Sequence, residues 1–152
     1  VQTCALPISQ PAGCSPVATA WVEGQTHPKS VIPDTIAKSL AIGNPADGLY
    51  SVGIANKTEG SGTIVPENEV AEGMKLLAET EGIFTETAGG VVISTLRKLA
   101  RDGVIGPDEE TVALITGTGL KTIEVIEDTI ELKTIEPTVR SFDEIVMGAP
   151  VS

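Results

Sequence analysis

The 152 residues include 10 lysines and arginines against 21 aspartates and glutamates, a formal net charge of -11. Such an acidic surface repels polyanions, so nucleic acids and anionic membranes are poor candidate partners. With 41% hydrophobic residues, only 3% aromatic residues and 16 glycines, the chain has the composition of one aliphatic α/β domain.

Cysteine content and hydropathy narrow the class of protein further. Cys4 and Cys14 are too few for a disulfide framework, which favours a cytoplasmic setting. No group of cysteines and histidines has the spacing of metal ligands, so we predict no metal site. No apolar run approaches the roughly 18 to 20 residues that would cross a bilayer, and the N-terminus lacks the basic flank of a signal peptide.

The opening stretch, VQTCALPIS, resembles the peptide obtained when a common sequencing adapter is translated in frame. We therefore expect residues 1–9 to be such an artefact and residues 10–152 to belong to the protein's own fold. An ordinary frayed N-terminus is the alternative. Residues 1–9 are therefore excluded from the prediction of fold.

The first predicted helix lies in the stretch GCSPVATAWVEGQ. Ser15 can cap it, Pro16 suits its first position, where no backbone N–H is needed, and Gly24 suits a left-handed end. Further on, Asp34 stands in a capping position before a short apolar turn, which breaks at Gly43.

A second helix is predicted over Leu49–Lys57, followed by a short β-branched strand over Thr63–Val65. A third helix begins after Pro66, where acidic residues occupy the first turn and favour the positive end of the helix dipole. Its apolar residues recur at the spacing of one helix face: Val70, Met74 and Leu77.

A fourth helix is predicted in TETAGGVVISTLRKLARDG, with Gly103 ending it. Val92, Leu96 and Leu99 are expected to share one face of it. The β-branched run Thr111–Ile115 has the composition of a buried strand. Helices that alternate with short strands predict a parallel sheet, whereas the tail from Lys121 onward is ambiguous between strand and helix.

The segment LITGTGLKT, Leu114–Thr122, sends the last predicted strand directly into a loop of glycines and threonines. A P-loop is excluded because one residue, not four, separates Gly117 from Gly119, and Leu120 follows in place of lysine. A dinucleotide-binding fingerprint would need a third glycine. What remains is the Thr116 hydroxyl at the end of a strand, where Gly117 allows close backbone approach. A structural turn is the alternative interpretation.

Glu86 raises a similar choice at the start of the fourth helix. A glutamate there usually serves as a capping or dipole partner, but Gly89 and Gly90 would let a ligand approach it closely. Ligands of parallel α/β sheets collect where strands end, so the loops of Glu86 and Thr116 are expected to converge on one crevice. His27 is interpreted as a solvated loop residue, and Cys14 has no partner base.

Three stretches resemble the C-terminal third of bacterial threonine synthases: Pro33–Gly48, Glu81–Ile105 and Glu109–Thr122. The similarity extends from about Gln10 to Val146. It implies an α/β fold: part of the large three-layer αβα domain that binds pyridoxal phosphate in the tryptophan-synthase-β-like fold type, here truncated.

The resemblance also implies the cofactor, pyridoxal 5′-phosphate, and the residues around it. The first residue of the family's Thr-Gly-x-Gly-Leu-Lys segment, here Thr116, bonds the pyridine nitrogen with a neutral hydroxyl. Glu86 matches a glutamate beside the cofactor, and the loop of Gly43, Asn44 and Pro45 approaches the same crevice. The cofactor-binding residues implied are Thr116, Gly117, Glu86, Gly43 and Asn44.

Two departures from the family pattern matter. Position 118 is threonine where relatives usually carry histidine or asparagine, which puts its part in substrate positioning in doubt. The Schiff-base lysine of the family lies in a Ser-Phe-Lys-Asp type segment of its N-terminal half, and no lysine of this chain has that context. We therefore expect no catalytic residue in this chain, and a chain that is inactive by itself.

The resemblance implies that the parent enzyme is a lyase that converts O-phosphohomoserine and water to L-threonine and phosphate. Its oligomeric state is open, a homodimer being one option. A serine or threonine dehydratase of the same fold type is one alternative. A self-standing module that binds a small molecule, with the tail from Ile123 as an effector-binding unit, is another.

Overall fold

The computed structural model describes residues 7–129 and 132–148. The helices and strands follow in this order: β1 (Ile8–Pro11), α1 (Pro16–Val22), α2 (Gly48–Lys57), β2 (Gly62–Val65), α3 (Glu67–Glu81), α4 (Thr87–Arg101) and α5 (Val139–Ile145). Short 3₁₀ turns lie between them: η1 (Ala12–Cys14), η2 (Lys38–Leu40), η3 (Gly119–Lys121), η4 (Ile123–Val125) and η5 (Glu127–Thr129). Within these ranges, no helix is both long enough and apolar enough to cross a membrane.

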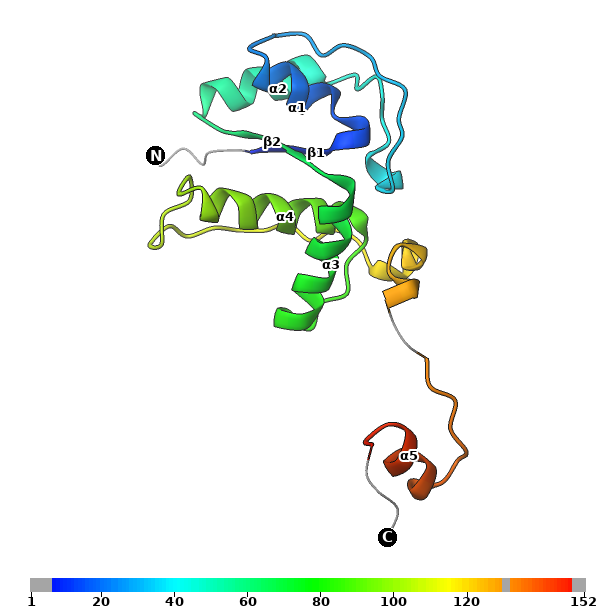
Figure 1. Ribbon diagram of the computed structural model, residues 1–152. Helices are drawn as coiled ribbons and strands as arrows, with labels where there is room; N and C mark the ends of the chain where they lie inside the picture. Colours follow the sequence, from blue (N-terminus) through cyan, green and yellow to red (C-terminus); the bar gives the residue numbers. More distant parts are fainter. Residues whose placement is uncertain (1–6, 130–131, 149–152) are drawn as a thin grey trace.

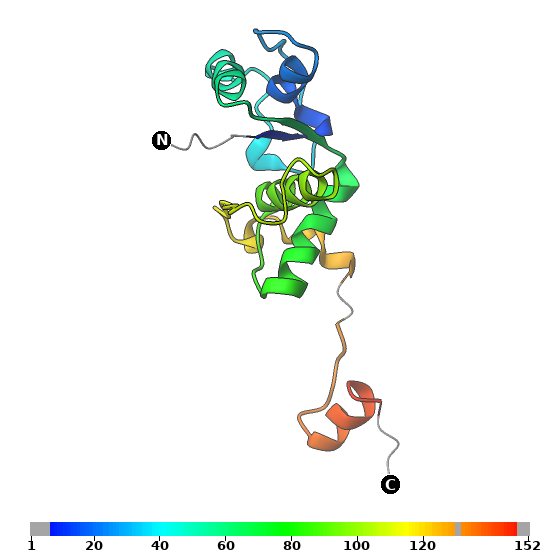
Figure 2. The same ribbon diagram turned by 90° about the vertical axis from the view of Figure 1, so that its left-hand side faces the viewer.

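The sheet is parallel, as predicted. β1 pairs with β2 in a register that runs from Ile8 opposite Gly62 to Pro11 opposite Val65. Parallel neighbours need a crossover connection, which α1 and α2 supply. These two helices cover one face of the strands and α4 covers the other (Figures 1 and 2). The chain is therefore an α/β protein with helices on both faces of a small parallel sheet.

Each side of the sheet has its own apolar core. On the side of α1 and α2, Val17, Ala20 and Val52 pack with Ile8 and Trp21. The core on the opposite side contains Ala37, Val65, Val70 and Val91, with Ile36 and Leu40 against it. Burial of these aliphatic side chains on both faces is what a parallel sheet requires.

α1 forms where it was predicted, but its N-terminus is capped by a different residue. The Ser15 hydroxyl bonds Thr19 Oγ1 at 3.0 Å and makes no capping bond to the backbone. The side chain of Gln10, in β1, caps the helix instead: its Oε1 accepts hydrogen bonds from Val17 N at 2.8 Å and from Ala18 N at 3.0 Å. The expected end at Gly24 is confirmed, since that glycine has φ 68°.

The turn after Asp34 has no side-chain cap: η2 begins at Lys38, and its N-cap residue is Ala37. Thr35 Oγ1 accepts from Ala37 N at 3.1 Å, and the Asp34 backbone N–H donates to Gly13 O at 2.8 Å. The prediction of Asp34 as the cap was therefore wrong. The Thr35 hydroxyl is held in place because it donates to the Glu67 carboxylate at 2.9 Å, a contact between residues 32 positions apart that spacing cannot reveal.

α2, β2 and α3 lie close to their predicted positions, and Val70, Met74 and Leu77 are buried as expected. α4 also forms as predicted, ending before Gly103 with φ 69°. Of the three residues expected to share a face, only Leu99 is buried, and Val92 and Leu96 are half-buried. The other buried residues of the helix include Val91, Ile93, Ser94 and Thr95.

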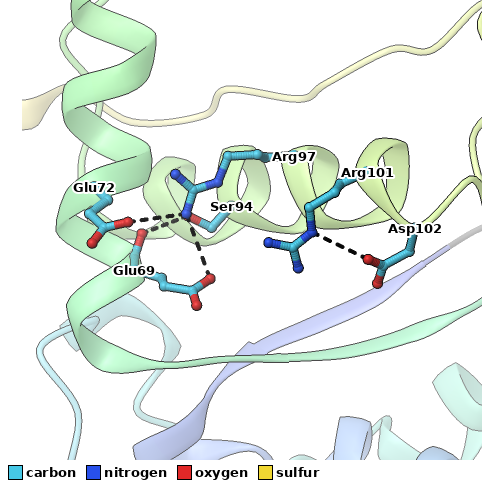
Figure 3. Close-up of polar contacts among 6 residues, drawn as sticks. All are labelled: Glu69, Glu72, Ser94, Arg97, Arg101 and Asp102. Atoms are coloured by element: carbon cyan, nitrogen blue, oxygen red, sulfur yellow. Dashed lines mark hydrogen bonds and ion pairs between the residues drawn. The ribbon is translucent and has the colours of Figure 1, made fainter.

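Which residues of α4 are buried is decided by the way this helix crosses α3. A Cβ on Gly73 would collide with Gly90 O and lie 2.6 Å from Ser94 Oγ, so the helices touch through small residues. Ser94 donates to Glu69 O at 2.6 Å. At the rim, Arg97 Nη2 of α4 lies 3.1 Å from Glu72 Oε2 and 3.7 Å from Glu69 Oε2 of α3 (Figure 3).

The predicted strand at Thr111–Ile115 is absent. The segment is extended without ladder partners, and Val112 and Leu114 have 77% and 71% of their surface exposed. A strand needs a neighbour for its backbone groups, and the described residues place none beside it. The ambiguous tail contains the 3₁₀ turns η4 and η5 and the helix α5, whose Thr138 side chain accepts from Ser141 N at 3.2 Å.

Candidate functional site

Two loops meet where α4 begins. The Glu86 backbone N–H donates to Gly117 O at 3.1 Å, and Thr85 Oγ1 donates to the same carbonyl at 3.1 Å. Gly119 N in turn donates to Phe84 O at 3.0 Å, and Thr85 and Thr118 form an antiparallel bridge. The loop before α4 and the loop after the Thr111–Ile115 segment therefore form one unit.

The two glycines of the second loop allow this contact. A Cβ on Gly117 would collide with the carboxylate of Glu86, and a Cβ on Gly119 would collide with the ring of Phe84. Any larger residue at either position would separate the loops. This close approach explains the Gly-x-Gly spacing, which neither phosphate-binding motif accounted for.

Glu86 is the buried charge of the unit. It is only 6% exposed and occupies the N-cap position of α4, yet its side chain makes no capping hydrogen bond. The positive end of the helix dipole favours a carboxylate there. Lys121 Nζ lies 3.6 Å from Glu86 Oε1, with 60% of the lysine side chain exposed.

The residue after Glu86, Thr87, ties the second loop to the start of α4. Thr87 N donates to Thr122 Oγ1 at 3.2 Å, which closes the far end of the second loop onto α4. The Thr87 hydroxyl is buried and has no hydrogen-bond partner among the described residues. Buried polar groups are normally satisfied, and Trp21 Nε1, Thr63 Oγ1 and Thr95 Oγ1 are unpartnered in the same way, so the Thr87 hydroxyl by itself marks no binding site.

The structure brings together three of the five predicted site residues. Glu86 and Gly117 are in contact, and Thr116, the neighbour of Gly117, is exposed, with a hydroxyl that makes no hydrogen bond within the described residues. Gly43 and Asn44 contact another segment: Gly43 O accepts from Val31 N at 2.9 Å, and Asn44 Oδ1 accepts from Ser30 Oγ at 3.1 Å. No described contact joins them to the unit around Glu86.

Lys121 is a neighbour of Glu86 that the sequence did not single out. Lys121 lies in the Thr-Gly-x-Gly-Leu-Lys segment, so its position in that segment was the available signal. Nothing in the sequence marks the Thr87 hydroxyl as unpartnered, because that depends on what packs around it.

The other titratable candidates are not part of this unit. His27 is exposed, and its Nδ1 bonds Thr26 Oγ1 at 2.8 Å. Cys14 is buried, and burial raises the pKa of its thiol, which disfavours the reactive thiolate. Within the ranges that the structure describes, no group of three or more histidine, cysteine, aspartate or glutamate side chains could hold a metal ion.

Comparison with known proteins gives the class of protein to which this fold and site belong. The sequence model of the family described as Pyridoxal-phosphate dependent enzyme matches residues 3–117. The chain belongs to this family, whose cofactor is pyridoxal phosphate. Residues 7–9, which we expected to be an artefact, lie inside this match, and Ile8 and Ser9 form part of β1.

Within that family the chain is similar to threonine synthases. It is 36% identical over 116 residues to that of Methanocaldococcus jannaschii, covering 74% of this chain and 28% of the relative. The enzyme of Halalkalibacterium halodurans is 37% identical over 112 residues, covering 74% and 31%, and that of a Bacillus species 30% over 122 residues, covering 79% and 35%. The chain thus spans about a third or less of the length of these relatives, between 28% and 35%.

Proposed function

We propose that this chain forms the C-terminal part of the pyridoxal-phosphate-binding domain of a cytoplasmic threonine synthase. The parent enzyme would convert O-phosphohomoserine and water to L-threonine and phosphate. The similarity to threonine synthases from three organisms supports this substrate over those of a dehydratase.

The observation that carries the proposal is the joining of Glu86 to Gly117, which leaves the Thr116 hydroxyl exposed and unpaired among the described residues. A ring that needs a neutral hydrogen-bond donor for its nitrogen and a close approach of backbone fits these residues. When bound, the cofactor supplies an electron sink for the reacting carbon atoms.

Thr116 would bind the cofactor through its hydroxyl. A hydroxyl donates a hydrogen bond to the pyridine nitrogen and leaves the nitrogen unprotonated, whereas a carboxylate at the same place would hold a proton there. Gly117 lets the backbone pass against Glu86, and Glu86 places a buried charge next to the ring. We retain Gly43 and Asn44 as proposed cofactor residues, although their described contacts are with Ser30 and Val31.

We further propose that the Schiff-base lysine comes from another part of the polypeptide and that this chain is inactive by itself. Its seven lysines all lack the Ser-Phe-Lys-Asp context: Lys29, Lys38, Lys57, Lys75, Lys98, Lys121 and Lys133. The exposed Val112 and Leu114 are the proposed contact of this chain with that other part.

A chimera tests the proposal. The matched region of the M. jannaschii enzyme is replaced by the corresponding residues of this chain, and phosphate release from O-phosphohomoserine is measured beside deamination of serine and threonine. We expect phosphate release, and a loss of about 100-fold with Thr116→Ala.

Two results would contradict parts of the proposal. Deamination without phosphate release would favour the dehydratase alternative. Phosphate release by the unmodified 152-residue chain would show that its predicted inactivity is wrong. A Thr26→Ala chimera, altered at an exposed loop hydroxyl, is the control for the Thr116 variant.

A further inference from the structure

We propose that Lys121 is a positioning residue that holds the Glu86 carboxylate in place beside Gly117. Its importance for catalysis depends on the proposed function, but the pairing itself can be tested without cofactor. Lys121 Nζ lies 3.6 Å from Glu86 Oε1, and among the described residues no other basic side chain is paired with Glu86.

The position of Lys121 is set by the backbone around it. Gly119 N donates to Phe84 O at 3.0 Å on one side of it, and Thr122 Oγ1 accepts from Thr87 N at 3.2 Å on the other. Thr122 is only 4% exposed. Lys121 is therefore attached to a turn that is fastened to both flanks of Glu86, so the backbone of the lysine is held close to the carboxylate while its side chain stays largely exposed.

The pairing with Lys121 also compensates the buried negative charge of Glu86. A carboxylate that is removed from water is costly unless a partner compensates its charge. The residues of the first turn of α4, Thr87 to Gly90, are neutral, so the helix dipole is the only other favourable charge that α4 offers there. The nearest acidic residue along the second loop, Glu124, lines a separate hollow with Lys38 and Glu67.

Glu86 has little freedom on the side of Gly117, where even a Cβ would collide with its carboxylate. Lys121 attracts the carboxylate from the solvent side. Without the lysine, the carboxylate would turn toward water or toward Thr116, next to which we place the cofactor ring. Lys121 thus keeps the negative charge of Glu86 at a defined position relative to that ring.

The first test uses the cofactor-free 152-residue chain with Lys121→Gln, Lys121→Arg and the control Lys98→Gln. Lys98 pairs with Asp102 at 2.6 Å at the other end of α4. The readouts are the side-chain carboxyl carbon resonance of Glu86, assigned with Glu86→Gln, and hydrogen exchange of the Glu86 amide, which bonds Gly117 O.

We expect Lys121→Gln to move the resonance and to speed exchange about threefold to tenfold, as expected for one partly buried ion pair. Lys121→Arg should restore both readouts, and Lys98→Gln should change neither. About 1 M salt should speed exchange in the unmodified chain, because the lysine is exposed and its charge is screened. Unchanged readouts in Lys121→Gln, or no response to salt, would overturn the pairing.

The second test places the same substitutions in the chimera. Lys121→Gln should alter the absorption spectrum of the bound cofactor and lower kcat about tenfold with little change in KM, and Lys121→Arg should reverse both effects. If the first test succeeds and the chimera does not act on O-phosphohomoserine, the pairing stands and the proposed function fails. If the spectrum and kcat stay unchanged, Lys121 does not position Glu86 for catalysis.

Discussion

Two β-branched segments of this chain, Thr63–Val65 and Thr111–Ile115, have similar composition and opposite surroundings. The first lies in β2, pairs with β1, and buries Val65 to 1% exposure between the sheet and α4. The second has no strand beside it among the described residues and leaves Val112 77% exposed. The difference teaches that composition marks a segment as able to form a strand, whereas a partner strand makes it one.

The largest loss of stability in the packed region is expected from Gly90→Val. A Cβ at that position would collide with Val70 O, so α3 and α4 would have to separate. We expect a loss of about 3 kcal/mol in the free energy of unfolding, measured in urea by the fluorescence of Trp21. Gly53→Val in α2 is the control, because a Cβ there meets nothing within 4 Å. An equal loss in both variants would show that the crossing does not depend on small residues.

Truncating one valine in each of the two segments measures how much each segment contributes to the free energy of unfolding. Val65→Ala should lower the free energy of unfolding by about 2 kcal/mol, since it leaves a cavity in the core with Val70 and Val91. Val112→Ala should change it by less than about 0.5 kcal/mol. Urea unfolding of both variants measures the difference. A large loss in Val112→Ala would mean that this residue is buried in solution.

The smallest expected effect concerns the end of α4, where the packed region gives way to the exposed one. The hydrogen bond from Lys98 holds the pKa of Asp102 below its ordinary value. The carboxylate therefore stabilises the folded state above the unfolded pKa, and this contribution is lost as pH falls through the lower, folded pKa. Lys98→Ala should lower the melting temperature slightly at pH 7 and by less at pH 2.5. The same decrease at both values would contradict the pairing.

Local signals in the sequence were sufficient for most of the helices. The end of α1 at Gly24, α2, and the buried Val70, Met74 and Leu77 of α3 follow from glycine conformation and apolar spacing, which act within one element. The same reasoning failed for caps that come from elsewhere in the chain. Gln10 satisfies the first N–H groups of α1 from a neighbouring strand, and β1 itself was missed because residues 1–9 were left out.

For the candidate site, too, the sequence indicated the residues but not how they are arranged. Glu86, Thr116 and Gly117 could be selected from their positions at a helix start and after a β-branched run, and from the family resemblance. Their mutual arrangement could not, because 31 positions separate Glu86 from Gly117 along the chain. Lys121 shows the same limit: its residue type is visible in the sequence, but its partner is not.

The sequence by itself determined the helices α1 to α4, the glycines that follow α1 and α4, and the acidic, aliphatic character of an α/β chain, since backbone preference and apolar spacing depend on neighbouring residues. Only the tertiary structure decided which face of α4 is buried, which β-branched run becomes a strand, and which side chain faces Glu86. Those outcomes depend on contacts between segments far apart in the chain, where the packing of Gly73 on Gly90 and of Gly117 on Glu86 decides the geometry.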